Sequence, residues 1–563
     1  MKHFLLIFMM LLSNLQAGWM TQMGEIQQHD VVQQSYLKGL LTRNTYGIYR
    51  INSDVDFDLL RRLYRENGYR LFWEGKRGSI NALLTWIDRS EQEGLNPRRY
   101  HQKQIRSLST ALFEERFTNP RDRNLALVSL DILLSDAFLG LSHDLNEGLI
   151  EYRKFQAILA NRSKREQIDY KWAVAPPKYD YTKLMLETLN AGNISEKLKM
   201  LVGQNEVYRG LTKAYRKYLR IRREGGWETI PSGKALRKGM QGPRVDLLAR
   251  RLSITGDLDP YHTDYLYFDA RLFRALKKFQ RRHDIWPSGV MTEETRRALN
   301  VPVSKRLAQI KLNLEHSRWE KESYGNEYIW INIPDFMMYF FSGRRVALKM
   351  RVIVGRKKNP TPVFTSKMSY VVLNPYWSVP SSIVKKEMLP RLQEDPDYLA
   401  SRNFKAYDNW RAGREPIDTL DVDWYQYDEN SSIPYIFVRD PGEGNPLGKM
   451  KFIFPNRFAV YMHDTPNKAL FKNSIRAYSH GCIRLHQPQK LLEFVSSRYS
   501  AESMLRIQKV LEEGKNESVG LTRKIPVHIR YYTSWLGENG EVEFRKDVYG
   551  YDPIFRQIIK NSD

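Results

Sequence analysis

The periodicity of apolar residues changes near Tyr328, and this change constrains the fold of the 563-residue chain most strongly. Before it, stretches such as DLLRRLYRENG and LALVSLDILLSDAFLGLSHDL repeat apolar residues at helical spacing. After it, YIWINIPDFMMYFFSGRRVALKMRVIVG alternates β-branched and aromatic residues, with Ser342-Gly343 as a hairpin turn. The sequence therefore predicts a multi-domain α+β protein, with a helical N-terminal scaffold and a β-rich C-terminal domain.

Proline- and glycine-rich breaks divide the chain further, for example GGWETIPSGK, which begins at Gly225. After this linker, three short amphipathic segments predict a compact three-helix module. A long polar stretch interrupts the β-rich domain and indicates a substrate-facing lobe or lid. The predicted segments are a helical scaffold (18–226), the three-helix module (234–300), a helical linker (301–323), the β-rich domain (324–551, with an insertion at about 381–448) and a C-terminal tail (552–563).

The first seventeen residues have the pattern of a signal peptide. Lys2 and His3 precede a short apolar run, which decays to the small residues Ala17 and Gly18. The run is much shorter than the ~20 residues that span a bilayer, so we expect export and cleavage near Ala17. An uncleaved anchor is the alternative. We expect no later stretch to be long and apolar enough to span a membrane.

The chain is strongly basic, with a formal net charge of +25 and a pI near 9.7. Such a field favours anionic partners. Nucleic acid fits poorly, because the chain carries an export signal and no nucleic-acid motif. An anionic envelope polymer or membrane surface fits better, although basic residues dispersed over solvated faces would also explain much of the excess.

Cys482 is the chain's only cysteine, and His480 and His486 flank it, with His463 nineteen positions upstream. An inert buried thiol is one interpretation. Zinc would need ligands at paired spacing, and disulfide exchange would need a second thiol. Nucleophilic catalysis fits better: His463 can act as base, Gly481 lets the backbone approach a substrate, and Arg484 favours a thiolate.

The residues around this thiol resemble a known family. His463 followed by Ser479-His480-Gly481-Cys482-Ile483-Arg484 is similar to the signature of the YkuD-type L,D-transpeptidase catalytic domain. VIVGRKKNPTPVF, LNPYWSVP and GNPLGKMKFIFPN resemble its flanking segments, in the same order. The three-helix module resembles a peptidoglycan-binding module, although Ser288 stands where an acidic residue is usual. The whole chain resembles the large periplasmic L,D-transpeptidases.

The resemblance implies roles for named residues. Cys482 would attack the carbonyl of meso-diaminopimelate in a tetrapeptide stem and release D-Ala, with His463 as base and the Asp464 carbonyl orienting it. Amides near Gly481 and Cys482, helped by the Tyr461 hydroxyl, would hold the oxyanion. A second diaminopimelate amine would resolve the thioester into a 3→3 cross-link. The residues expected to line the substrate pocket are Tyr461, Ser479, His480 and Arg484.

Several alternatives to these roles stay open. Tyr461 could simply pack, Ser479 could only turn the loop, and His480 could be structural or even the base. Water or a lipoprotein amine could replace the stem-peptide acceptor, which would give an L,D-carboxypeptidase or a wall-attachment enzyme. A non-catalytic wall-binding scaffold is an alternative of a different class.

The resemblance also implies partners and a location. The expected partners are peptidoglycan stem peptides, as tetrapeptide donor and diaminopimelate acceptor, together with other cell-wall synthesis enzymes. No cofactor, metal or nucleic acid is implied. We expect a periplasmic, wall- or membrane-associated enzyme whose cysteine is acylated by carbapenems.

Overall fold

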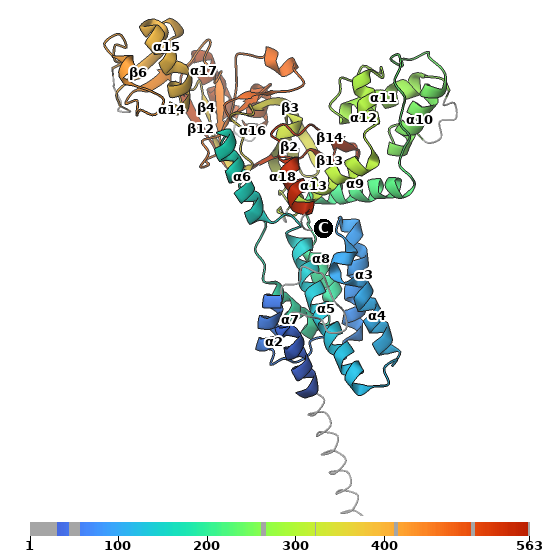
Figure 1. Cartoon of the computed structure of the whole chain (residues 1–563). Helices are drawn as coiled ribbons and strands as arrows, with labels where there is room; N and C mark the ends of the chain where they lie inside the picture. Colours follow the sequence, from blue (N-terminus) through green and yellow to red (C-terminus); the bar gives the residue numbers. More distant parts are fainter. Residues whose placement is uncertain are drawn as a thin grey trace, which may run out of the picture.

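The computed structural model describes residues 31–43, 57–259, 266–320, 323–409, 415–496 and 501–560. The predicted signal peptide, residues 1–17, lies outside them. Figure 1 shows a helical stem whose far end carries the β-rich domain, with a small lobe on one side and a three-helix module on the other. Helices make up the N-terminal half and strands concentrate in the C-terminal half, so the predicted fold class is confirmed.

The stem is a helical bundle built around one long helix. Its helices are residues 31–42, α2 (Phe57–Glu66), α3 (Arg77–Arg89), α4 (Gln102–Phe113), α5 (Pro120–Asn146), α7 (Tyr181–Ala191) and α8 (Ile194–Leu201). Asn119 caps α5, because its side chain accepts the Arg121 amide. Two further helices of the N-terminal half, α6 (Tyr152–Glu166) and α9 (Glu206–Arg223), pack on the β-rich domain instead.

Helix α5 corrects one expectation from the sequence. Within the described residues, its 27 residues are long and apolar enough to cross a membrane by length and composition. Its central window is 78% buried inside the bundle, as in the core helix of a globular domain. Asp131 lies in this helix and accepts hydrogen bonds from the Trp73 amide at 2.8 Å and the Tyr64 hydroxyl at 2.7 Å. Burial raises the pKa of Asp131 to about 6.

The β-rich domain is a mixed sheet that closes on itself, with strand order β10-β3-β11-β9-β8-β4-β12-β1-β2 and a further pairing of β2 with β3. Alternation directs one set of apolar residues inward, and helices α16 (Pro488–Ser496) and α17 (Ala501–Glu513) follow the sheet's last short strands. The strands are β1 (Glu327–Asn332), β2 (Met337–Ser342), β3 (Arg345–Gly355), β4 (Phe364–Leu373), β8 (Met450–Ile453), β9 (Met462–His463), β10 (Ala477–Ser479), β11 (Ile483–Leu485) and β12 (Glu517–Arg530).

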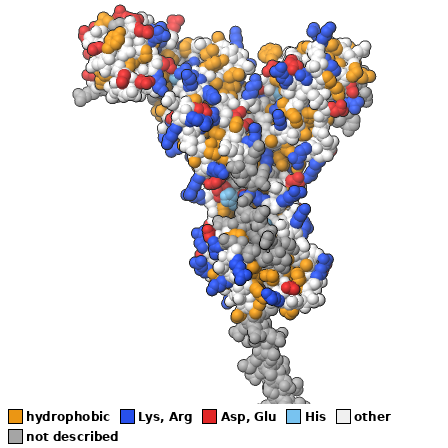
Figure 2. All heavy atoms as spheres, in the orientation of Figure 1, with side chains coloured by type: hydrophobic (Ala, Val, Ile, Leu, Met, Phe, Trp, Pro, Cys, Tyr) orange, Lys and Arg blue, Asp and Glu red, His pale blue; other side chains and the backbone are white. Residues whose placement is uncertain are grey.

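The insertion forms a separate lobe with its own small core around the buried Trp424. It contains a short helical stretch, interrupted by a π-helical turn, and a three-stranded sheet. Its elements are β5 (Trp377–Ser378), α14 (Ser381–Ile383), the π-helical turn η4 (Val384–Met388), α15 (Leu389–Glu394), β6 (Phe404–Tyr407) and β7 (Ile436–Arg439). Residues 381–448 hold eight Lys and Arg against thirteen Asp and Glu, so the lobe is acidic within a basic chain. Figure 2 shows acidic side chains on this lobe, with Lys and Arg dispersed elsewhere on the visible face.

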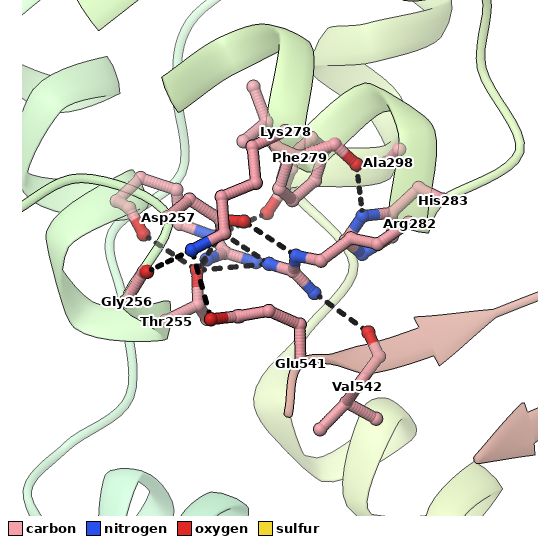
Figure 3. Close-up of polar contacts among 12 residues, drawn as sticks. Thr255, Gly256, Asp257, Lys278, Phe279, Arg282, His283, Ala298, Glu541 and Val542 are labelled. Atoms are coloured by element: carbon pink, nitrogen blue, oxygen red, sulfur yellow. Dashed lines mark hydrogen bonds and ion pairs between the residues drawn. The ribbon is translucent and has the colours of Figure 1, made fainter. Parts of the chain in front are cut away.

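The three-helix module is joined firmly to the β-rich domain. Its helices are α10 (Pro243–Thr255), α11 (Ala270–Arg282) and α12 (Glu293–Leu299), and Thr292 caps α12 by accepting the Thr295 amide. Figure 3 shows Arg282 reaching from α11 to the Asp257 carboxylate and to the Val542 carbonyl of the hairpin formed by β13 (Ser534–Leu536) and β14 (Val542–Phe544). Lys278 adds an ion pair to Glu541 at 2.9 Å. These contacts fix the module against the hairpin.

Two segments predicted as linker and tail instead lie in the core. Helix α13 (Val303–Ser317) packs against α9 and β13, and α18 (Asp552–Lys560) packs against α6 and α13. Phe555 of α18 stacks on Phe155 of α6, with ring centroids 4.7 Å apart. Both helices bury apolar faces, so they are packed between the N-terminal helices and the β-rich domain and are not exposed connecting segments.

Candidate active site

The nucleophile loop connects β10 to β11 and places Cys482 at the start of a central strand. Gly481 has a φ of +116°, a conformation that L side chains rarely adopt. Thr361 lies in the segment that connects β3 to β4, and its hydroxyl stabilises the loop by donating to the Gly481 carbonyl at 2.8 Å. The turn therefore needs glycine at this position.

The strand register places four predicted residues on one face of the sheet. Strands β9 and β11 run parallel, with Arg484 opposite His463. Residues two positions earlier, Cys482 and Tyr461, share that face because side chains alternate along a strand. Lys451 of β8 lies opposite His463, so its side chain is on the same face as the other four. Sulfur, imidazole, phenol and two cations thus gather on the outer wall of the sheet.

His463 is positioned as a neutral base. Its Nδ1 lies 2.6 Å from the Asp464 carbonyl, which can only accept, so Nδ1 carries the proton and Nε2 presents a lone pair. Burial, aided by the Arg484 charge, lowers the pKa of His463 to about 3. The predicted orienting contact through the Asp464 backbone is therefore present in the structure.

The thiol is held in its protonated form. Burial raises the pKa of the Cys482 thiol, although hydrogen bonds from Tyr461 and the charges of Lys451 and Arg484 act to lower it. Arg484 therefore favours the thiolate, as predicted, but desolvation outweighs the two cations and keeps the pKa of Cys482 raised. The sulfur also lies 3.8 Å from the Ala459 carbonyl, in the loop between β8 and β9.

Tyr461 and Arg484 flank the sulfur. Burial and the neighbouring Cys482 raise the pKa of Tyr461, so its hydroxyl stays a donor. Lys451 Nζ lies 3.9 Å from the centroid of the Tyr461 ring and braces it. The Arg484 Nε is buried and has no hydrogen-bond partner among the described residues. Both side chains remain available to a ligand.

Ser479 faces into the loop rather than into a pocket. Its hydroxyl donates to the Cys482 carbonyl and accepts the Gly481 amide at 3.1 Å, and the side chain is buried. It therefore shapes the turn, which was the alternative to its predicted role in substrate binding. The same contact occupies the Gly481 amide, so the expectation that this amide holds an oxyanion does not fit this loop conformation.

His480 contacts the lobe. Its Nε2 lies 2.6 Å from Glu387 in the π-helical turn, and Arg356 lies 3.0 Å from the same carboxylate. Arg356 also donates its backbone amide to the Ser479 carbonyl. His480, the residue before Gly481, thus connects the nucleophile loop to the lobe, and it is not positioned as the base.

Sequence reasoning missed four residues of this site: Lys451, Arg356, Thr361 and Glu387. Lys451 could have been found from the alternation of KFIF towards the sheet's outer face, but the other three depend on tertiary contacts. Among the described residues, no group of three or more His, Cys, Asp or Glu side chains could hold a metal ion.

Comparison with known proteins assigns the β-rich domain. Residues 326–529 match the family model of the YkuD domain, described as the L,D-transpeptidase catalytic domain. The chain contains a YkuD L,D-transpeptidase catalytic domain. Residues 58–214 match a family described as "Scaffold domain", and residues 241–299 match one described as "Putative peptidoglycan binding domain". The resemblances of the catalytic domain and of the three-helix module, read from the sequence, are therefore confirmed.

Relatives of the YkuD domain support the same assignment. A curated protein of Haemophilus influenzae named "Putative L,D-transpeptidase" is 35% identical over 230 residues. The match covers 41% of this chain and 45% of that protein, so it spans less than half of either. A solved L,D-transpeptidase structure from Mycobacterium smegmatis is 13% identical, and the match covers 37% of this chain and 60% of that one, with a TM-score of 0.17. A solved L,D-transpeptidase structure from Stackebrandtia nassauensis is also 13% identical, and the match covers 54% of this chain and 96% of that one, with a TM-score of 0.20. Those scores are too low to support an argument about the site.

Proposed function

We propose that this protein is an L,D-transpeptidase that forms 3→3 cross-links between meso-diaminopimelate residues of peptidoglycan stems through a cysteinyl thioester. The YkuD domain supports the reaction class, and the peptidoglycan-binding domain supports a peptidoglycan substrate. The observation that carries the finer proposal is a neutral, oriented His463 on the same face of the sheet as Cys482.

In the first half-reaction, the Cys482 sulfur attacks the diaminopimelate carbonyl while its proton passes to His463 Nε2. The carbonyl oxygen becomes an oxyanion, and the Cys482 amide and Tyr461 hydroxyl are the donors placed to stabilise it. The tetrahedral intermediate collapses to a thioester, and D-Ala leaves with the proton from His463. Arg484 binds a stem carboxylate, because a guanidinium matches carboxylate geometry.

In the second half-reaction, the side-chain amine of another diaminopimelate attacks the thioester. His463 accepts a proton from this amine and returns it to the sulfur, so the thiol is regenerated. In this proposal the lobe, which Glu387 connects to the nucleophile loop, lies next to the acceptor stem during this step. We further propose that the protein acts in the periplasm at the wall, because its first seventeen residues have the pattern of an export signal.

The test uses purified protein and a disaccharide-tetrapeptide from a diaminopimelate-type wall, with products separated by liquid chromatography and identified by mass spectrometry. We expect a dimer that lacks one D-Ala, and no dimer with Cys482→Ala. Tripeptide alone would instead indicate water as acceptor. Unchanged substrate, together with a thiol that forms no carbapenem adduct, would overturn the enzymatic proposal.

A further inference from the structure

A cavity lies on the outer wall of the sheet, away from the thiol. It has a volume of about 820 Å³, within the range of ligand pockets. Strands β4 and β12 form its floor, the segment after α13 and residues 173–177 of the N-terminal half form one wall, and the loop from Pro455 to Phe458 forms the other. The cavity therefore lies where three parts of the chain meet.

One buried polar group in the cavity lining has no hydrogen-bond partner among the described residues. The Nδ1 of His528 faces an Arg530 amino group at 3.2 Å, and a guanidinium can only donate. The imidazole is neutral, because burial and Arg530 lower the pKa of His528 to about 2, so Nε2 carries the proton. This Nε2 is buried and unpaired in the part of the chain that the structure describes, whereas the Tyr324 hydroxyl beside it interacts with Glu320 and Arg530. Unpaired donors are costly, so the lining suits a ligand rich in acceptor oxygens.

The charge around the cavity favours an anion. Arg530 is neutralised by its ion pair with Glu320 at 2.6 Å. Lys367 and Arg457 add two exposed cations to the lining. The two exposed cations therefore favour a carboxylate at the cavity.

The cavity is within reach of the thiol. Its loop wall ends at Phe458, and the next residue, Ala459, contacts the Cys482 sulfur through its carbonyl. Ser366 of β4 anchors the same loop, because its hydroxyl donates to the Pro455 carbonyl at 2.6 Å. Four strand spacings of ~4.8 Å separate β11 from β12, about 19 Å. An extended tetrapeptide spans roughly 14 Å, which reaches the loop wall and β4 but not β12, so the sugar attached to the stem is the part that can meet His528.

We propose that this cavity binds a carboxylate-bearing part of a peptidoglycan stem peptide, beyond the atoms that meet Cys482. The proposal rests on the transpeptidase function proposed above. Its chemistry is attraction of a stem carboxylate by Lys367 and Arg457, with donation from His528 to an oxygen of the attached sugar. The stem can come from the donor strand or from the acceptor strand, and the experiment separates the two sources.

The first measurement is the Kd of the disaccharide-tetrapeptide for the full chain carrying Cys482→Ala. Adding Lys367→Gln and Arg457→Gln should raise this Kd about five-fold, since each removes one exposed charge interaction. The matched control is Lys103→Gln with Arg121→Gln, which removes two exposed charges from the helical stem and should leave the Kd unchanged. A probe with amidated carboxylates should bind the charge variant and its control equally, because the charge interaction with the cavity is then absent from both.

The second measurement assigns the source by steady-state kinetics with an intact Cys482. A raised KM for the donor places the donor stem in the cavity, and a raised KM for the acceptor amine places the acceptor stem there. An equal Kd in the charge variant and its control overturns the cavity proposal, even where dimer formation and carbapenem acylation proceed normally. Absence of dimer with the unaltered protein overturns the proposed function instead, and a Kd difference would still support the cavity.

Discussion

The charge state of His463 sets the acid limit of the proposed reaction. With a pKa of about 3, roughly 1% of His463 is protonated at pH 5, whereas an ordinary histidine of pKa 6.5 would be about 97% protonated. Only the neutral imidazole can accept the Cys482 proton. We therefore expect the rate constant for acylation of Cys482 by a carbapenem to change less than about twofold between pH 7 and pH 5. An ordinary histidine would lower it about 25-fold.

The assay is loss of β-lactam absorbance in a stopped-flow instrument, with the adduct checked by intact mass. Arg484→Gln is an informative variant, because the Arg484 charge is the second cause of the low pKa after burial. Its acid limb should move to higher pH. A half-maximal rate near pH 6.5 in the unaltered protein would refute the reasoning, since it would mean that His463 is solvated or carries a nearby anion.

Other parts of the structure give three further predictions. Glu387→Gln removes a half-exposed ion pair worth about 1 kcal/mol or less, so substrate KM should rise up to about five-fold with kcat nearly unchanged, and a fall in kcat alone would contradict it. Burial lowers the pKa of His316 to about 3, so between pH 6 and 3 the unfolded chain binds a proton at this position and the folded protein does not. Acid therefore destabilises the fold through His316 by about 1.4 kcal/mol per pH unit, and His316→Phe should remove this part of the pH dependence of the free energy of unfolding. Parallel curves for the two proteins would contradict this. Arg282→Leu strands the buried Asp257 carboxylate and should cost about 3–5 kcal/mol in denaturant unfolding, whereas Arg297→Leu on the exposed face should cost almost nothing.

The chemistry of the site could be predicted from the sequence because its key residues are nearly contiguous. Cys482 and Gly481 lie in one six-residue motif, and His463 ends a recognisable strand. The orientation of the motif's other side chains could not be predicted. Ser479 turns its hydroxyl into the loop and His480 reaches Glu387, 93 positions away, and both outcomes depend on how the loop packs against β3 and the lobe.

The fold class followed from apolar periodicity, but the way the parts join did not. Helix α13 was predicted as a linker and the segment containing α18 as a tail, because each is short and stands next to a domain boundary. Their apolar faces find partners far away in sequence, as Phe555 does with Phe155. Periodicity shows that a helix has a face to bury, but it does not show which element buries it.

The pKa values of the resting thiol and imidazole are moved apart by burial, which raises that of Cys482 and lowers that of His463 to about 3. Both shifts disfavour a thiolate–imidazolium pair before substrate binds, so we expect the proton to pass to His463 as the sulfur attacks. We expect the ultraviolet absorbance of the unaltered protein at pH 7 to equal that of Cys482→Ser, with no thiolate contribution. A thiolate signal at neutral pH would show that the pair forms before substrate binds, and proton transfer concerted with attack would then be wrong.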